Sequence, residues 1–257
     1  MKVLLSFDIE EFDMPLEYGK AIDFQQQIEI SIRGTTIILD LLRKYNVEAT
    51  FFSTAVFATH ATSIIDRLIS EGHELASHGF FHSSFEDGHL LASKTTLEQI
   101  SGQHVNGFRM PRMMPVNDDA LQRAGYTYNS SMNPIFLPGR YNNFSKPRTL
   151  FYTGDTTQLP ASVTPVMRFP LFWLSFHNVP LALYQSACAR TMKHDKYLNI
   201  YFHPWEFTDL CDCKFGLPWY VSKNSGSKMI DRFDRWLMWM QKKEYHFSTI
   251  SKHLRTV

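Results

Sequence analysis

Two histidines, His78 and His82, lie four residues apart in the stretch "SHGFFHSSF" (residues 77–85). A glycine and a pair of phenylalanines in the same stretch disfavour a long helix. Neutral imidazoles are frequent ligands of divalent metals. Because the chain has 11 histidines in 257 residues, chance alone supplies about half a pair at this spacing. The pair therefore indicates a metal site only if other ligands converge on it.

The acidic stretch "SFDIEEFD" (residues 6–13) can supply those ligands. Asp8 and Glu10 are two residues apart, so in a continuing strand they point to the same side while Ile9 points into the packing. Two neutral imidazoles and one carboxylate form a three-ligand set for a catalytic divalent metal, with positions left for water and substrate. A second carboxylate beside the metal can act as a base, because the metal lowers the pKa of bound water.

Two further side chains can complete a catalytic site. Arg109, in "GFRMPRMMP", can hold a carboxylate with two hydrogen bonds, which would keep Asp8 ionised and oriented. His203, in "YLNIYFHPWEF", follows an apolar run and precedes a proline. Its imidazole could therefore face the site and protonate a leaving nitrogen.

Short apolar runs alternate with segments of helical period along the whole chain, which is typical of repeated strand–helix units. The fold class predicted is α/β, a distorted (β/α)7-type barrel in a single domain of residues 1–257. The helix containing Ile28 to Tyr45 should end near Asn46, and Ser63 and Asn117 are expected N-caps. Strands are expected at residues 2–7, 47–53, 73–78, 105–109, 126–131, 148–153, 197–202 and 246–250. Further helices are expected around residues 63–71, 90–101, 117–124, 181–193 and 226–243.

The expected strands end in polar residues that apolar packing does not explain. These residues are Asp8, Glu10, His78, Arg109, Asn129 and His203. In such barrels the carboxyl ends of the strands form one rim, where the chemistry gathers. Each residue alone has an ordinary structural explanation, such as a surface ion pair or a satisfied histidine. Their joint position favours a site.

Residues 132–165 show no clear period and are expected to form long loops with one short strand. The apolar stretch 164–184 is interrupted by Arg168, Pro170, His177 and Pro180, so it cannot span a membrane. Its part "PLFWLSF" could pack in the core, line a substrate wall or form a membrane-docking lip.

The composition is that of an ordinary globular protein. The 26 basic and 25 acidic residues balance, without the excess that nucleic acid or an anionic membrane would attract. Cys188, Cys211 and Cys213 are an odd number and are expected to be reduced thiols. The apolar run after Lys2 is too short for a signal peptide, so a cytoplasmic location is expected.

The ordered set of motifs resembles the metal-dependent polysaccharide deacetylases of carbohydrate esterase family four. The motifs are "SFDIEEFD", "SHGFFH", "RMPR" and "YFHPWEF", and together they span about residues 3 to 207. The resemblance implies a distorted, roughly seven-stranded barrel that removes acetyl groups from N-acetylated sugars with zinc or a similar ion; cobalt, manganese or nickel could replace it.

Carried over by position, the resemblance implies catalytic roles for three residues, namely Asp8 as base, Arg109 as the residue that positions it, and His203 as acid. It also implies His78 and His82 as metal ligands. The commonest motif of the family has a second aspartate where this chain has Ile9. A D-x-E branch would make Glu10 the third ligand, with Glu11 as the fallback.

Relatives often have an aspartate at the position of Asn129. The partner of His203 therefore stays open among Asn129, Asp155 and Glu206. The resemblance implies an N-acetylated saccharide as substrate, and the expected location would make it a precursor inside the cell. Two alternatives remain: a related hydrolase of cyclic amides such as an allantoinase, and a catalytically silent carbohydrate-binding barrel. The oligomeric state is not predicted.

Overall fold

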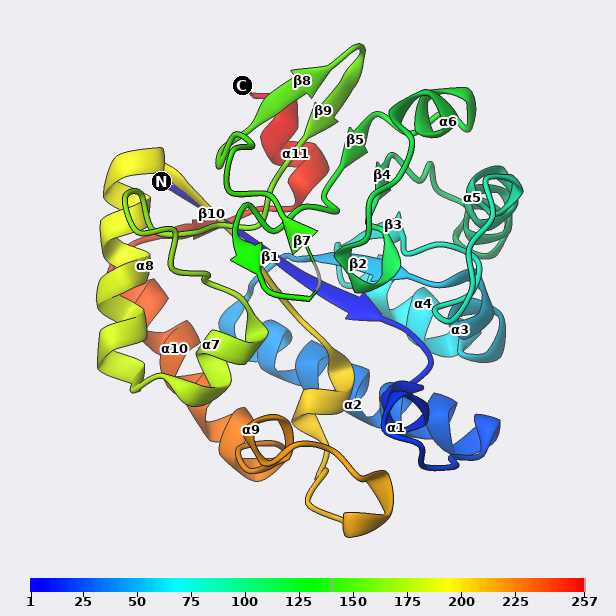
Figure 1. Cartoon of the computed structure of the whole chain (residues 1–257), viewed down its shortest axis with the longest axis horizontal. Helices are drawn as coiled ribbons and strands as arrows, with labels where there is room; N and C mark the ends of the chain where they lie inside the picture. Colours follow the sequence, from blue (N-terminus) through cyan, green and yellow to red (C-terminus); the bar gives the residue numbers. More distant parts are fainter. Residues whose placement is uncertain (140, 257) are drawn as a thin grey trace.

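The computed structural model describes residues 1–139 and 141–256. A curled, largely parallel sheet forms its centre, and helices cover the outside of the sheet (Figure 1). The spatial order of the strands is β10-β1-β2-β3-β4-β5-β9-β8, with β11 also paired to β1. This half-barrel confirms the predicted α/β barrel class, although β8 and β10 lie at the two ends of the strand path and leave the sheet open there. The single-domain boundaries stay a prediction.

The main sheet contains eight parallel strands and one antiparallel edge strand, and a separate hairpin lies beside it. The parallel strands are β1 (Lys2–Ile9), β2 (Thr50–Ser53), β3 (Glu74–Ser77), β4 (Gly107–Phe108), β5 (Tyr128–Asn129), β9 (Thr156–Gln158), β10 (Tyr197–Phe202) and β11 (His246–Phe247). The edge strand is β8 (Phe151–Thr153), and the hairpin is β6 (Phe136–Leu137) with β7 (Tyr141–Asn142).

The helices differ widely in length. They are α1 (Met14–Glu17), α2 (Phe24–Tyr45), α3 (Ala55–His60), α4 (Thr62–Ser70), α5 (Gly88–Ser101), α6 (Asp118–Arg123), α7 (Trp173–Asn178), α8 (Leu181–Asp195), α9 (Trp219–Ser222), α10 (Ser227–Lys242) and α11 (Ile250–Leu254). Among the described residues, none of these helices is long and apolar enough to cross a membrane.

Successive side chains of strand β1 point to opposite faces of the sheet, as in any strand, and therefore lie in two different apolar clusters. Phe7 and Ile9 belong to the large apolar core on the helix side. Leu4 belongs to a second apolar cluster, with Phe52 of β2 and Tyr128 of β5. The polar side chains that share the face of Leu4 therefore point into the curl of the sheet.

A side-chain bridge spans the open side of the sheet. Asn199 of β10 donates from Nδ2 to Ser130 Oγ, at 3.1 Å, and to the carbonyl oxygens of Leu159 (3.2 Å) and Pro160 (3.1 Å). The backbone N–H of Ser162 donates to the carbonyl of Asn199, at 2.8 Å. Hydrogen bonds from a loop thus join the two ends of the sheet where strand pairing does not.

Helix α2 packs closely against the segment that follows β10. An ideal Cβ at Gly34 would lie 1.9 Å from the carbonyl oxygen of Pro204, a distance that no side chain permits. A glycine inside a helix is unfavourable relative to alanine. This glycine is explained by the close approach, which fixes the chain next to His203.

The cap predictions have mixed outcomes. Helix α2 ends with Asn46 in the left-handed conformation, and Asn117 accepts hydrogen bonds from the N–H groups of Asp119 and Ala120, as predicted. The N-cap at Ser63 is wrong: α4 begins at Thr62, because Ala61 alone separates it from α3. Strand β9, the β6–β7 hairpin and helix α7 were not predicted, since their segments are too short to show a period.

Candidate active site

The loops that follow β1, β3 and β10 converge on one cavity of about 420 Å³. Asp8, Glu10, His78, His82 and His203 all line it. The structure brings these five predicted residues to one cavity, whereas Asn129, also predicted on the rim, does not line it. Arg109 lies directly beneath, with no exposed surface.

Glu10, His78 and His82 form a cluster in which the possible ligand atoms lie within 4.8 Å of one another. Glu10 Oε2 is 3.1 Å from Nε2 of His78 and 3.1 Å from Nε2 of His82. These contacts lack hydrogen-bond geometry, and Glu10 Oε2 is buried with no hydrogen-bond partner among the described atoms. Three atoms that could each bind a metal ion therefore face one another.

The outer hydrogen bonds of the two imidazoles decide which ring nitrogens face the centre. His78 Nδ1 lies 2.8 Å from the carbonyl oxygen of Arg109, and His82 Nδ1 lies 2.7 Å from Asp13 Oδ1. Both oxygens can only accept, so each Nδ1 carries a hydrogen. In the neutral rings both Nε2 atoms then present lone pairs toward Glu10.

The charges of the cluster fit a cation between these atoms. Burial alone would raise the pKa of Glu10, but the nearby His82, His78 and His203 hold it well below its usual range. Burial alone would lower the pKa of His82, whereas Glu10 and Asp13 raise it to about 9. Two imidazoles with one carboxylate are a donor set that suits a divalent metal.

Asp8 forms a buried ion pair with Arg109. Arg109 Nη1 donates to Asp8 Oδ1 at 2.6 Å and also contacts Ser6 Oγ at 3.0 Å. Its other nitrogens donate to Ser130, Nη2 to Oγ at 3.0 Å and Nε to the carbonyl at 3.1 Å. The expected two-bond grip on Asp8 is wrong, because Ser130 takes the remaining donors. Asp8 Oδ2 is left facing His203 Nε2, at 3.8 Å.

Glu206 is the hydrogen-bond partner of His203. Its Oε1 accepts from His203 Nδ1 at 3.0 Å and from the backbone N–H of His203 at 2.6 Å. Asn129 instead bonds Gln158 and Ser131, and Asp155 is exposed in the turn between β8 and β9. The alternatives left open by the sequence are thus reduced to Glu206.

A second histidine, His177 of α7, lies behind Glu206. His177 Nε2 is 2.8 Å from Glu206 Oε2, and both side chains are fully buried. Burial alone would raise the pKa of Glu206, but hydrogen bonds from His177 and His203 lower it below its usual value. Burial alone would lower the pKa of His203, but Glu206, Glu10 and Asp8 raise it above its usual value.

Trp205 connects the two halves of the site. Its ring stacks on His203 with centroids 4.6 Å apart, and its Nε1 donates to Glu10 Oε1 at 3.3 Å. Sequence reasoning missed Trp205, His177 and Asp13, although Trp205 lies inside the quoted motif "YFHPWEF". Glu11, the fallback ligand, accepts a hydrogen bond from Thr54 at 2.5 Å and does not join the cluster.

Aromatic side chains form much of the remaining cavity wall. Phe172 and Trp173, from the predicted stretch "PLFWLSF", line the cavity, and Tyr201 lines it from β10. The residues Leu171 and Phe176 of the same stretch belong to the core. The stretch is therefore partly a cavity wall and partly packing.

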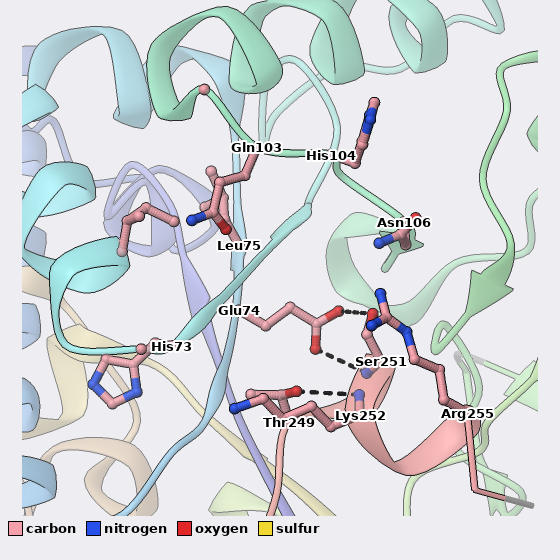
Figure 2. A pocket seen from close by; sticks show the side chains of 13 residues that line it. His73, Glu74, Leu75, Gln103, His104, Asn106, Thr249, Ser251, Lys252 and Arg255 are labelled. Atoms are coloured by element: carbon pink, nitrogen blue, oxygen red, sulfur yellow. Dashed lines mark hydrogen bonds between the residues drawn. The ribbon is translucent and has the colours of Figure 1, made fainter.

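A second cavity of about 450 Å³ lies at the opposite end of the strands (Figure 2). Glu74, the first residue of β3, points toward Ser251 of α11 there. Its carboxylate accepts from Tyr128 Oη at 2.9 Å, Thr50 Oγ1 at 2.8 Å and the N–H of Ser251 at 3.0 Å. Because this carboxylate is fully hydrogen-bonded, we assign it to holding α11 against the sheet.

Comparison with known proteins agrees with the motifs. A family model described as polysaccharide deacetylase matches residues 29–128, which include His78, His82 and Arg109. Over these residues the chain is similar to the polysaccharide deacetylase family. Within that family, a peptidoglycan deacetylase of Helicobacter pylori is 25% identical over 115 residues, which are 41% of this chain and 39% of that protein.

A peptidoglycan-N-acetylglucosamine deacetylase of Bacillus cereus is 32% identical over 73 residues, which are 28% of this chain and 31% of that protein. The chain thus aligns with less than half of the length of each of these two relatives.

Solved structures share the fold over nearly the whole chain. PuuE allantoinase superimposes with a TM-score of 0.69 at 12% identity, covering 99% of this chain and 89% of that one. A family-four pseudoenzyme of Bacillus anthracis gives a TM-score of 0.54 at 12% identity, covering 98% and 64%. At this identity the likeness shows that the chain has the same fold.

Proposed function

We propose that this chain is a metal-dependent amide hydrolase that removes acetyl groups from N-acetylated sugars of a surface polysaccharide or its precursor. The observation that supports this most directly is that Asp8 and His203, whose Oδ2 and Nε2 atoms lie 3.8 Å apart, line the cavity that also contains the Glu10, His78 and His82 cluster. The match to the polysaccharide deacetylase model and the activities of the two deacetylase relatives support the same reaction class.

Glu10, His78 and His82 would hold one divalent metal, for which zinc is the best match to the donor set, with cobalt, manganese and nickel as alternatives. When bound, the metal would polarise the acetyl carbonyl and make its water more acidic. Asp13 and the carbonyl of Arg109 hold the two imidazoles with Nε2 facing inward. Trp205 restrains the other oxygen of Glu10.

Asp8 is the proposed general base. Its Oδ1 is held by Arg109, so Oδ2 is available to take the proton of the attacking water. Arg109 does not touch the substrate and acts as the residue that keeps Asp8 charged and oriented.

His203 is the proposed general acid. Its Nδ1 hydrogen is directed to Glu206, so Nε2 faces the cavity and can deliver a proton to the leaving nitrogen. Cleavage of the C–N bond then gives acetate and a free amino group. Glu206 favours the protonated form of His203, and His177 fixes the second oxygen of Glu206.

The aromatic walls fit a saccharide. Trp173 and Tyr201 present ring faces and edges near His203, with centroids 5.4 and 5.8 Å from its ring. Sugar rings expose C–H faces that pack on aromatic rings, while their hydroxyls need nearby polar groups. Asn133 and Asp13 supply polar groups on the same cavity wall.

A hydrolase of cyclic amides is the second candidate, because PuuE allantoinase has the same fold over 99% of the chain. The same base, acid and metal ligands could open a ring amide. A silent carbohydrate-binding barrel is the third possibility raised by the sequence. The complete set of base, acid and metal ligands argues against it.

A substrate panel tests the proposal. The purified chain, supplied with Zn²⁺, Co²⁺ or Mn²⁺, is incubated with N-acetylglucosamine oligosaccharides and with cyclic ureides. Release of acetate with one free amine per acetate is the expected result. Ring opening without acetate would replace the proposal by the cyclic-amide function. Absence of turnover on either class in a metal-loaded chain would favour the silent barrel.

A further inference from the structure

Two neighbouring segments, the β6–β7 hairpin with the turn that follows it and the loop of residues 164–169, expose large apolar side chains. Phe136 is 58% exposed, Phe144 53%, Val166 75% and Met167 85%. We call these four residues the apolar lip. Single exposed apolar residues are ordinary, but four from two adjacent loops form a patch of the kind that marks an interaction site.

The loop that carries Val166 and Met167 is built to present them. A bridge between Val163 and Pro170 closes its base. The N–H of Thr164 donates to the carbonyl of Phe169 at 2.9 Å, and the N–H of Arg168 donates to the carbonyl of Thr164 at 3.2 Å. Arg168 has a φ of +50°, which is unfavourable for a residue with a side chain. The chain thus accepts strain while it exposes two apolar side chains.

Arg168 joins this loop to the β6–β7 hairpin. Its Nη1 donates to the carbonyls of Pro134 at 3.0 Å and Lys146 at 2.9 Å, and its guanidinium lies 4.9 Å from the ring centroid of Phe144. Leu137 and Tyr141 of the hairpin line the active-site cavity. The apolar lip is therefore continuous with the cavity mouth.

The segments that carry the apolar lip contain the basic residues Lys146, Arg148 and Arg168, of which Arg148 is paired with Asp195. Lys146 is exposed at the hairpin, and neither Lys146 nor Arg168 is ion-paired to a carboxylate of residues 1–139 or 141–256. Lys146 and Arg168 therefore place two positive charges beside the apolar lip.

We propose that the apolar lip docks reversibly on an anionic lipid bilayer. Met167, Val166 and Phe144 enter the interface, and Lys146 and Arg168 lie at the level of the lipid phosphates. Docking turns the cavity mouth toward the bilayer. An acetylated sugar carried on a lipid would there reach the cluster of Glu10, His78 and His82. Only this last step rests on the proposed function, because docking itself needs no turnover.

Co-sedimentation of the full chain with vesicles tests the docking. We expect binding to phosphatidylcholine vesicles that contain phosphatidylglycerol, weak binding to phosphatidylcholine alone, and loss of binding at high salt. The double variant V166S/M167S should lower the vesicle partition coefficient at least about tenfold. Lys146→Glu should lower it on anionic vesicles. The matched control is Leu91→Ser on α5, where Leu91 is 58% exposed, and it should bind as the unchanged chain does.

Thermal unfolding of each variant separates docking from folding, and the melting temperatures should agree with that of the unchanged chain. The proposal is wrong if the unchanged chain fails to bind anionic vesicles, if it binds neutral vesicles equally, or if the double variant binds as well as the control. Sedimentation equilibrium tests a second copy as the occupant. A dimer that V166S/M167S disrupts, without vesicle binding, would also overturn the proposal.

Discussion

Glu206→Gln should separate the acid step from every other property of the site. Glutamine has the shape of glutamate, so its Oε1 can still accept from the His203 backbone N–H and from Nδ1. Its Nε2 would face His177 Nε2, which must then become an acceptor. That tautomer places the hydrogen of His177 on Nδ1, a buried atom with no partner among the described atoms. The variant therefore loses the negative charge beside His203 and leaves the Nδ1 hydrogen of His177 without a partner among the described atoms.

The expected fall in kcat follows from the loss of that charge. Hydrogen bonds to charged groups are worth about 1.5–3 kcal/mol, and this amount of lost stabilisation of protonated His203 corresponds to a fall in kcat of about 10- to 150-fold. KM and zinc stoichiometry should stay within about twofold, because Glu206 touches neither the cavity nor the metal ligands. His177→Gln should have a smaller effect, since His177 acts only through Glu206.

The assay compares two leaving groups. Acetate release from an N-acetylated oligosaccharide requires protonation of an amine, whereas a nitrophenyl acetate ester loses a leaving group that needs no proton. Glu206→Gln should slow the first substrate and leave the second nearly unchanged. The matched control is Glu74→Gln, which changes a hydrogen-bonded carboxylate at the opposite end of the strands and should preserve both activities.

An equal loss on both substrates in a folded, metal-loaded Glu206→Gln variant would refute this reasoning. A variant that retains full amide hydrolysis would refute it as well, because His203 would then not depend on Glu206.

Three further predictions concern other groups. Asp8→Asn should bind zinc normally but lose about 10²–10⁴-fold in kcat, measured by turnover with metal analysis; near-normal activity would rule out Asp8 as the base. Glu10→Gln should weaken zinc binding more than about 100-fold in a chelator competition, whereas Glu11→Gln, outside the cluster, should not; equal effects would point to the wrong ligand. Burial lowers the pKa of His73 to about 4 in the folded chain. As the pH falls below about 6.5, the unfolded chain therefore binds a proton that the folded chain does not bind, and the free energy of unfolding decreases. Between pH 7 and 5 this loss should be about 2 kcal/mol in urea unfolding and should largely disappear in His73→Gln, which can still accept from the N–H of Ala49; an unchanged pH dependence would exclude His73 as the source.

Much of the site could be predicted because it depends on short-range rules. Asp8 and Glu10 share a face through the two-residue period of β1, and parallel strands bring His78 and His203 to the same end. The link between His203 and Glu206 is also local, because a glutamate three residues after a helix-capping position reaches back to the cap N–H. The sequence "HPWEF" has this three-residue spacing between His203 and Glu206.

The remaining features depend on contacts between distant segments. His177 meets Glu206 only because the unpredicted helix α7 lies at the end of β10. The single hydrogen bond from Arg109 to Asp8 depends on Ser130, which takes two other donors from the adjacent strand end. Neither arrangement has a spacing that marks it in the sequence, since the partners are brought together by packing.

The burial of Ile9 determines how this chain differs from relatives with adjacent aspartates. Ile9 has no exposed surface and lies in the apolar layer between the sheet and the helices. An aspartate there would place a carboxylate among hydrocarbon side chains, on the opposite side of the strand from the imidazoles. Ile9→Asp would therefore destabilise the fold and would not add a metal ligand. Side chains of β1 point alternately to the two faces of the sheet. This alternation, more than the number of acidic residues, determines which carboxylate can serve as a ligand.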